Sequence, residues 1–191
     1  MIHNANHIRE NQDGLKVGGH QASSASIVSI MTALYFNILR PEDRVAVKPH
    51  ASPVFHAIQY LSGLQTKEKI ENFRGFGGAQ SYPSRTKDID DVDISTGSVG
   101  LGVAMTSFIS LIQDYIARKK FYNNRQLGRM IALVGDAELD EGNVYECLQE
   151  GWKHDLRNVW WIIDYNRQSL DGVVHEGLSE RLSSVFSAFD W

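Results

Sequence analysis

The sequence predicts an α/β fold, a doubly wound parallel sheet with helices on both faces. Three short runs, "RVAVK" (44–48), "RMIALV" (129–134) and "NVWWIID" (158–164), are apolar without polar alternation, as in strands covered on both faces. Segments with helical spacing separate these runs, which favours parallel strand connections. With 191 residues, the chain can bury a substantial core. We therefore expect residues 1–191 to form a single domain.

The helices are predicted from apolar spacing and from end signals. Residues 22–39 begin with small polar residues and continue with apolar ones at helical spacing, which predicts one mostly buried helix. Ser52-Pro53 starts a second helix that ends at Gly63, and Thr66 caps a short one over 66–73. The same spacing predicts three further helices, over 99–120, 143–155 and 178–189.

Residues 74–100 are rich in Gly, Ser and Asp and show little periodicity. A loop of this length inside a compact domain is usually functional, so we expect it to serve a site. Its acidic stretch "DIDDVD" (88–93) lacks the spacing and the closing Glu of a calcium loop. We expect these carboxylates to form a solvated loop face.

Composition excludes several classes of partner. The net charge of −4 creates no field that would attract nucleic acid or an anionic membrane, and no apolar window is long enough to span a bilayer. Cys147 is the only cysteine, which excludes a disulfide and a cysteine-based zinc site. The polar N-terminus lacks the apolar segment of a signal peptide. We expect a cytoplasmic protein in which Cys147 is buried.

Polar side chains follow two of the predicted strands. Asp136 comes just after "RMIALV", and Asn166 comes just after "NVWWIID", thirty residues later. One strand–helix–strand unit of this length would place both at the same edge of a parallel sheet, where ligands bind. Carboxylate, amide and main-chain carbonyl oxygens suit Mg²⁺, which completes its coordination with phosphate oxygens and water. The pattern predicts a magnesium-bound diphosphate, helped by helix N-termini near Ser98 and Asn143.

Several motifs resemble the thiamin-diphosphate-dependent transketolase superfamily. "GDAELDEGN…NRQSLDG" resembles the signature in which Gly-Asp-Gly is followed about thirty residues later by Asn. "KVGGHQASSAS", "KPHASPVFHAIQYLSGLQTKEKIENFRG", "SYPS" and "STGSVGLG" are most similar to the N-terminal diphosphate-binding domain of homodimeric pyruvate dehydrogenase, the decarboxylating component, and more distantly to transketolase. The resemblance implies a domain of the thiamin-diphosphate-binding fold.

The resemblance also implies roles for individual residues. His20 and His50 would be catalytic histidines: His20 would lie near the reacting carbonyl, and His50 would approach the cofactor. The residues implied to hold magnesium are Asp136 and Asn166 through their side chains and Gln168 through its main-chain carbonyl. Those implied to contact thiamin diphosphate are Ser23, His50, Val99, Gly100, Asp136, Ala137, Glu138, Asn166 and Leu170. Two positions depart from the family: Ala137 replaces a glycine, which is tolerable where φ is negative, and Lys48 replaces a glutamine.

In this superfamily a second domain, often from another subunit, binds the aminopyrimidine ring of the cofactor. Nothing in the 191 residues resembles that domain. The resemblance therefore implies a truncated part of a longer enzyme, inactive alone, whose missing half comes from a homodimer or from another chain. The implied substrate is a small 2-oxo acid that is decarboxylated before its acyl unit is passed on.

Three other interpretations stay open to different degrees. "TGSVGLG" and "SLDG" also suit transketolase, whose substrates are ketose phosphates. A decayed copy could keep the fold as a non-catalytic scaffold. A nucleotide-binding α/β domain is disfavoured, because no Walker or G-x-G-x-x-G loop follows the first predicted strand.

Overall fold

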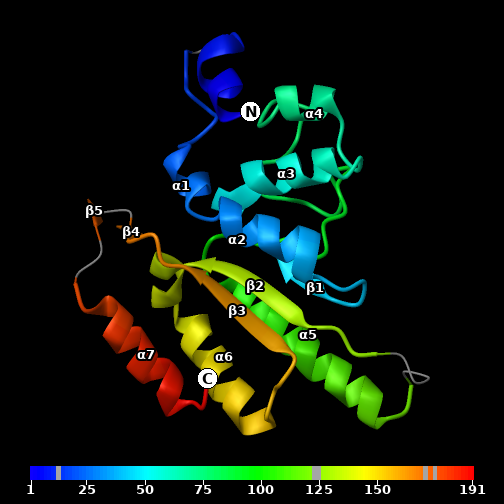
Figure 1. The fold of residues 1–191 in the computed structure, drawn as a ribbon, viewed down its shortest axis with the longest axis vertical. Helices are drawn as coiled ribbons and strands as arrows, with labels where there is room; N and C mark the ends of the chain where they lie inside the picture. Colours follow the sequence, from blue (N-terminus) through cyan, green and yellow to red (C-terminus); the bar gives the residue numbers. More distant parts are fainter. Residues whose placement is uncertain (12–13, 122–125, 170–171, 174–175) are drawn as a thin grey trace. The chain divides into compact units, whose positions relative to one another are not determined.

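The chain forms two compact units in the computed structural model, which describes residues 1–11, 14–121, 126–169, 172–173 and 176–191 (Figure 1). Unit 1 comprises Met1–Arg40 and Val47–Gly97. Unit 2 comprises Pro41–Ala46 and Ser98–Trp191. Each unit has its own elements and its own buried side chains.

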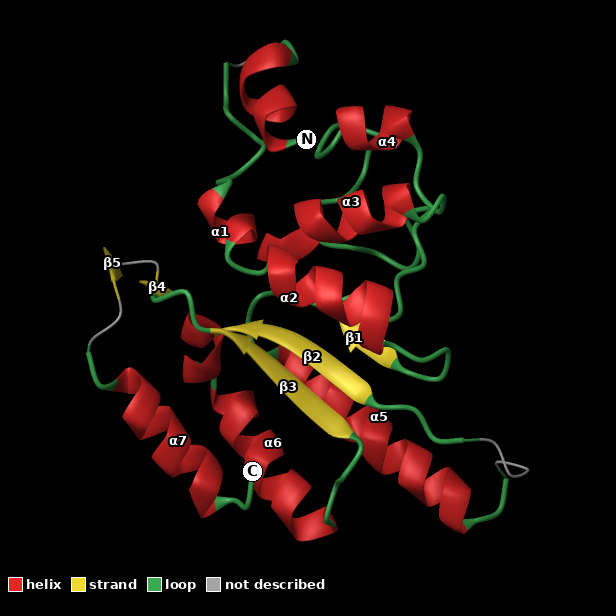
Figure 2. Cartoon of the chain, in the orientation of Figure 1, coloured by secondary structure: helices red, strands yellow, loops and turns green. Residues whose placement is uncertain are grey.

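Unit 2 contains a parallel three-stranded sheet with the order β1-β2-β3 (Figure 2). The strands are β1 (Arg44–Ala46), β2 (Met130–Gly135) and β3 (Val159–Asp164). The helices of this unit are α5 (Leu101–Arg118), α6 (Gly142–His154) and α7 (Leu178–Ala188), with the 3₁₀ helix η4 (Asp136–Asp140) directly after β2. A short antiparallel pair, β4 (Gln168–Ser169) and β5 (Gly172–Val173), follows β3. The predicted α/β class with a parallel sheet is confirmed.

The core of unit 2 lies between the sheet and its helices. Ala132 and Val134 point to the same face of β2, because side chains two residues apart share a face. They pack with Val103 of α5 and with Cys147 of α6, which is buried as predicted. Trp161 of β3 packs against this cluster together with side chains of α7. The apolar run of β2 is buried along its length, as expected for a strand covered on both faces.

One buried ion pair joins the start of β1 to the start of β2. The Asp43 carboxylate is 4% exposed, and it accepts hydrogen bonds from the backbone N–H of Arg129 (2.7 Å) and from its Nε (3.0 Å). The hydrogen bond to Asp43 is the main cause that raises the pKa of Arg129. The guanidinium also lies 4.2 Å from the centre of the Trp160 ring. These contacts set the register between the two strands.

Unit 1 is helical. Its elements are η1 (Asn4–Ile8), α1 (Ala22–Ala25), α2 (Val28–Ala33), η2 (Leu34–Ile38), η3 (Pro49–Ala51), α3 (Ser52–Leu61) and α4 (Lys67–Glu71). The predicted single helix over 22–39 is wrong: it is divided at Ile27 (φ −98°, ψ −3°) and ends in a π-helical turn. The break follows three serines, whose side chains compete with the backbone for hydrogen bonds. Thr66 caps α4 as predicted, since its Oγ1 accepts the Lys69 N–H at 3.3 Å.

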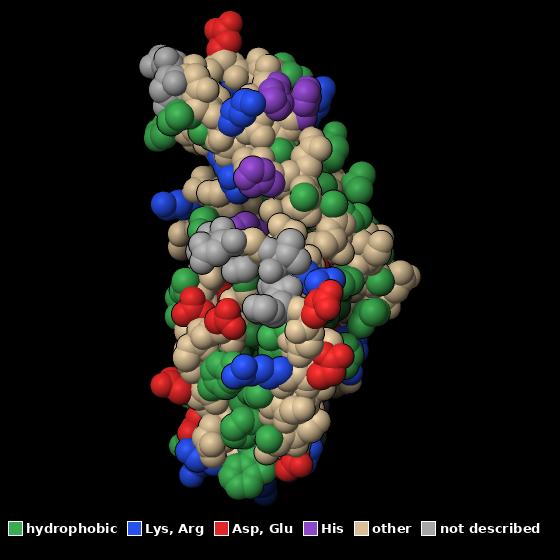
Figure 3. Space-filling view, turned by 90° about the vertical axis from the view of Figure 1, so that its left-hand side faces the viewer, with side chains coloured by type: hydrophobic (Ala, Val, Ile, Leu, Met, Phe, Trp, Pro, Cys, Tyr) green, Lys and Arg blue, Asp and Glu red, His purple; other side chains and the backbone are tan. Residues whose placement is uncertain are grey.

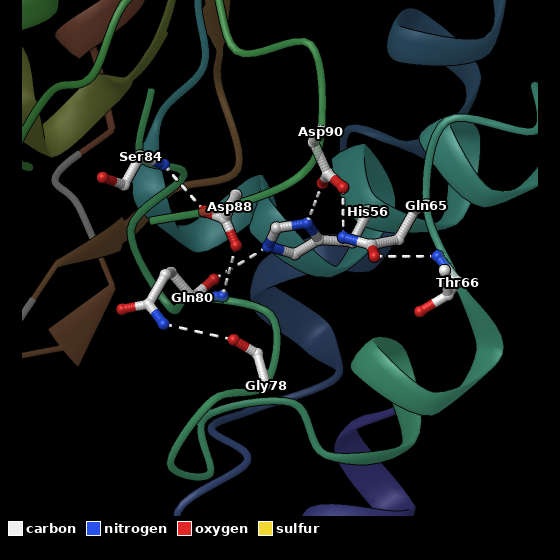
Figure 4. Close-up of polar contacts among 8 residues, drawn as sticks. All are labelled: His56, Gln65, Thr66, Gly78, Gln80, Ser84, Asp88 and Asp90. Carbon is white, nitrogen blue, oxygen red and sulfur yellow. Dashed lines mark hydrogen bonds and ion pairs between the residues drawn. The ribbon is translucent and has the colours of Figure 1, made fainter. Parts of the chain in front are cut away.

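A buried histidine fixes the path of the long loop after α4 (Figure 4). His56 of α3 is fully buried; its Nδ1 pairs with Asp90, and its Nε2 lies 2.8 Å from the carbonyl oxygen of Gln80. Gln65 donates to the same Asp90 carboxylate, and Asp88 accepts the Gln80 N–H at 2.9 Å. The expectation of a solvated acidic face is therefore wrong for Asp90, because an internal histidine pairs with it.

No helix in the described part of the chain is long and apolar enough to cross a membrane.

On the side of unit 2 that carries α7, hydrophobic side chains gather among charged ones (Figure 3). A pocket of about 390 Å³ lies there, and its apolar lining includes Ile163, Leu182 and Phe186.

Candidate functional site

Asp136 begins η4 immediately after β2 and is 2% exposed. Its Oδ1 accepts the N–H of Ala137 at 3.1 Å, and its Oδ2 accepts the N–H of Arg167 at 2.8 Å. Arg167 belongs to the loop after β3, and β2 and β3 end in register at Gly135 and Asp164. The carboxylate thus lies at the carboxyl edge of the sheet, held by the turns that follow both strands. Each carboxylate oxygen keeps acceptor capacity for a further ligand.

Asn166 lies in a tight turn between β3 and β4. Its Oδ1 accepts the N–H of Gln168 at 2.9 Å, and its Nδ2 donates to Asp164 Oδ2 at 3.1 Å. Arg167, between the two predicted ligands, has a positive φ of 60°, which closes the turn. The local bonds fix the orientation of the amide and leave one lone pair on its oxygen.

Ala137, which stands where the family motif has a glycine, fits the backbone of the turn after β2. It lies within η4, and it is absent from the residues with positive φ. An alanine therefore fits this position without left-handed strain. The departure from glycine does not disturb the turn after β2.

Glu138 joins this turn to the start of α5. Its Oε1 accepts the N–H of Gly100 at 3.0 Å. Gly100 precedes α5 with a left-handed backbone (φ 74°), and a Cβ there would lie 2.1 Å from Asn143 Oδ1. Asn143 Nδ2 in turn donates to the Val99 carbonyl at 2.9 Å. Hydrogen bonds therefore join the N-termini of α5 and α6, and the Gly100 N–H at the start of α5 donates to the Glu138 carboxylate.

The donor set fits Mg²⁺ in its chemistry. The predicted ligands are one carboxylate, one amide oxygen and one main-chain carbonyl, all hard oxygen donors of the kind that magnesium prefers. No group of three His, Cys, Asp or Glu side chains in the described ranges could hold a metal ion, so a metal here would depend on this mixed set. Asn143 Oδ1 is a buried acceptor without a hydrogen-bond partner among the described residues. It packs against the start of α5, where a Cβ on Gly100 would meet it.

The predicted histidines belong to unit 1. His20 and His50 are exposed, and Ser23 of α1 is half-buried. The neighbouring Ser24, rather than Ser23, contacts this region: its Oγ donates to the His50 carbonyl at 2.9 Å and fixes η3 against α1.

Positive charge surrounds His50. Its pKa is lowered first by the partial burial of the ring, then by the charges of Lys48 and Arg74. Arg74 donates from Nη1 to the Val17 carbonyl at 2.9 Å, and a Cβ on Gly19 would lie 2.9 Å from the same nitrogen. A side chain at Gly19 would displace this guanidinium, and the left-handed backbone there (φ 77°) also favours glycine. The lowered pKa leaves the His50 ring mostly neutral at neutral pH.

The predicted site residues thus fall into two groups. Unit 2 brings together the turn at Asp136–Glu138, the loop with Asn166 and Gln168, and the segment Val99–Gly100. His20, Ser23 and His50 lie in unit 1, and Leu170 lies outside the described residues. Sequence reasoning assigned no contact to Asn143, Arg167 or Ser24. Their roles depend on backbone geometry, which no sequence motif displays.

Comparisons with known proteins give a consistent result. The family described as "Transketolase, thiamine diphosphate binding domain" matches residues 18–191. The chain is 29% identical to one of the subunits of the apulose-4-phosphate transketolase of Phocaeicola vulgatus, over 91% of this chain and 62% of the relative. It is 27% identical to the pyruvate dehydrogenase E1 component of Mycolicibacterium smegmatis, over 100% of this chain and 21% of the relative.

Solved structures agree. The crystal structure of transketolase from Campylobacter jejuni superposes with a TM-score of 0.68 at 25% identity, covering 88% of this chain and 30% of that one. The chain thus spans less than two thirds of the length of these relatives. Fold, motif order and family match agree, and the chain belongs to the transketolase family of thiamin-diphosphate-binding enzyme domains.

Proposed function

We propose that this chain is the magnesium- and diphosphate-binding portion of a thiamin-diphosphate-dependent 2-oxo acid dehydrogenase of the pyruvate type. The observation that carries the proposal is the buried Asp136 carboxylate at the end of β2. It is held by the Arg167 N–H, from the loop that also contains Asn166. This bond joins the turns that follow the two strands of one strand–helix–strand unit, so Asp136 and the loop with Asn166 lie at the same edge of the sheet.

In this proposal Asp136, Asn166 and the Gln168 carbonyl hold Mg²⁺, and Ala137 and Glu138 form the turn beside the diphosphate. Val99, Gly100 and Leu170 contribute further contacts to the cofactor. When bound, thiamin diphosphate supplies a nucleophilic carbon and an electron sink. By resemblance to the family, Ser23 and His50 also contact the cofactor in this proposal, and His20 acts near the reacting carbonyl. Because His50 is mostly neutral at neutral pH, an unprotonated ring nitrogen can accept a proton.

The remaining half of the cofactor site comes, in this proposal, from a pyrimidine-binding domain on a second copy or on another chain. The similarity to a relative that is itself only one subunit of a transketolase supports a separate chain. We also infer a cytoplasmic location, since a single buried cysteine suits a reducing compartment. The chain alone should show no turnover of 2-oxo acids or ketose phosphates.

Calorimetry with thiamin diphosphate and Mg²⁺ tests the assignment, first on the chain alone and then with a pyrimidine domain supplied. Asp136→Ala should abolish the magnesium-dependent part of binding. The matched control is Asp140→Ala, since Asp140 lies in the same turn but is exposed. Retained magnesium-dependent binding by Asp136→Ala, or no binding by the wild-type chain with the pyrimidine domain present, would refute the proposal.

Transketolase-type ketol transfer is the second candidate, favoured by the named transketolases of Phocaeicola vulgatus and Campylobacter jejuni. With the second half supplied, carbon dioxide released from pyruvate should exceed ketol transfer from a ketose phosphate. The reverse ratio would make transketolase the better assignment.

A further inference from the structure

Arg74 lies beside both predicted catalytic histidines of unit 1. Its guanidinium packs against Gly19, the residue before His20, because a Cβ on this glycine would lie 2.9 Å from Nη1 and 3.4 Å from Nη2. Its charge also acts on the ring of His50. Partial burial is the main cause that lowers the pKa of His50, and the charges of Lys48 and Arg74 lower it further. A cationic group therefore adjoins the two histidines.

Most donors of this guanidinium have no acceptor among the described residues. An arginine carries five N–H donors in a planar fork. Nη1 of Arg74 donates to the Val17 carbonyl at 2.9 Å. Nε is buried and has no hydrogen-bond partner within the described ranges, and Nη2 makes no hydrogen bond there either. Nε and Nη2 together form the edge of the fork that pairs side-on with the two oxygens of a carboxylate.

The charge of Arg74 is also without a carboxylate partner. No aspartate or glutamate in the described part of the chain forms an ion pair with it. Burial is the main cause that lowers the pKa of Arg74, and Tyr82, whose phenol is neutral at neutral pH, acts in the opposite direction. Arg129, in contrast, has the Asp43 carboxylate. A partly buried cation without a counter-ion is costly, so a bound anion would stabilise both the charge and the unpaired Nε donor.

We propose that Arg74 binds the carboxylate of the 2-oxo acid substrate side-on through Nε and Nη2 and holds the substrate beside His20 and His50. The identity of this carboxylate rests on the proposed function. A planar fork matches two carboxylate oxygens, whereas a lysine ammonium binds as a point charge. Gly19 belongs to the arrangement, because a side chain there would displace the guanidinium.

The contact acts on substrate binding more than on bond cleavage. The carboxylate loses its charge as carbon dioxide departs, so its pairing with Arg74 is strongest before decarboxylation. Interactions that weaken in the transition state improve binding without raising the rate of the chemical step. In the completed enzyme, Arg74→Gln should therefore raise KM for the 2-oxo acid about tenfold and leave kcat nearly unchanged. A fall in kcat at constant KM would contradict this role.

An NMR titration of His50 in the chain alone tests the site without cofactor. A carboxylate bound to Arg74 offsets part of the positive charge that lowers the pKa of His50, so saturating pyruvate should raise this pKa towards 6.5. Methyl pyruvate is the matched ligand control, because it keeps the carbonyl but carries no charge, and it should cause no shift. Sodium chloride keeps the ionic strength constant. His50→Gln identifies the resonance by its loss.

Substitutions of Arg74 test the residue itself. Arg74→Gln should abolish the response of His50 to pyruvate. Arg74→Lys should weaken pyruvate binding about tenfold, because it keeps the charge but loses the side-on pair. Arg85→Gln is the matched control: it removes the same charge from an exposed arginine of unit 1, and it should respond like the wild type. Circular dichroism checks that the variants are folded, and the comparison of the two ligands on the wild-type chain needs no variant.

Three results would overturn the proposal: no response of wild-type His50 to pyruvate, an equal response to methyl pyruvate, or a response that persists in Arg74→Gln. A response to glycerol 3-phosphate without one to pyruvate would make a phosphate the bound group and would overturn the carboxylate assignment. The titration uses neither magnesium nor thiamin diphosphate. Failure at Arg74 is therefore distinguishable from failure of magnesium-dependent cofactor binding at Asp136.

Discussion

Replacing Gly100 by alanine should destabilise unit 2 through two separable effects. The first is backbone strain, because φ is +74° and an L-residue there costs about 1–2 kcal/mol. The second is a clash, because the new Cβ would lie 2.1 Å from Asn143 Oδ1 and 3.0 Å from Val144 Cγ2. Forced shifts of this kind cost about 1–3 kcal/mol, so the free energy of unfolding should fall by about 2–5 kcal/mol in total.

A second glycine, which has a left-handed backbone but no close contact, separates the backbone strain from the clash. Gly177 also precedes a helix in the same unit with a left-handed backbone (φ 87°), but its Cβ would meet only Glu180 Oε2, at 3.9 Å. Gly177→Ala should therefore cost only the first part, about 1–2 kcal/mol. Gly142 has neither a positive φ nor a neighbour within 4 Å, so Gly142→Ala should be neutral or stabilising.

Urea unfolding followed by circular dichroism measures all three variants. Adding Asn143→Ala to Gly100→Ala should recover part of the loss, because it removes the atom that the new Cβ meets first. The two substitutions should couple by about 0.5–3 kcal/mol, as neighbouring sites do. If Gly100→Ala costs no more than Gly177→Ala, the clash with Asn143 is absent, and the described packing between α5 and α6 is incorrect.

Two further predictions concern unit 1. Asp90→Asn should lower the free energy of unfolding by about 1–3 kcal/mol, because it disturbs the hydrogen bonds of the buried His56 and Gln65 side chains. Asp91→Asn, at an exposed neighbour, should change it little, and equal losses would contradict a special role for Asp90. Lys48→Gln should raise the pKa of His50 towards 6.5 in an NMR titration, since the Lys48 charge lowers it. A folded-state pKa below 6.5 also means that the unfolded chain binds this proton more readily, so below pH 6.5 His50 reduces stability. His50→Gln should lessen that acid-side loss, and an unchanged pH profile of urea unfolding would contradict it.

Much of the sheet could be predicted from sequence, because its strands are short apolar runs between segments of different composition. The run that forms β2 is apolar from Met130 to Val134 and is followed by Gly135, so its type and limits could be inferred. The end of β1 could not, because the apolar Val47 follows its last residue, Ala46. Residues 22–39 show the opposite case. Their apolar spacing fits one long helix, but the break at Ile27 depends on how α1 meets η3 through Ser24, a contact between distant segments.

The site shows a similar division. The side chains with ligand chemistry could be named in advance only through the family resemblance, because Asp and Asn after a strand often serve a turn alone. The partners that orient them could not, since Arg167 and Ala137 act through backbone N–H groups that nearly every residue possesses. The burial of Asp90 was unpredictable for a related reason: four acidic residues stand within six positions, and only the fold selects the one that meets His56.

The position of β3 has a practical consequence. Among the described strands it pairs only with β2, so one row of its backbone groups has no neighbouring strand in unit 2. Val159–Ile163 is apolar throughout, and Trp160 is 40% exposed. No lysine or proline interrupts this edge, and such residues are the usual protection against edge-to-edge pairing. The purified chain should therefore aggregate into β-rich material on storage, and Trp160→Lys should slow that aggregation.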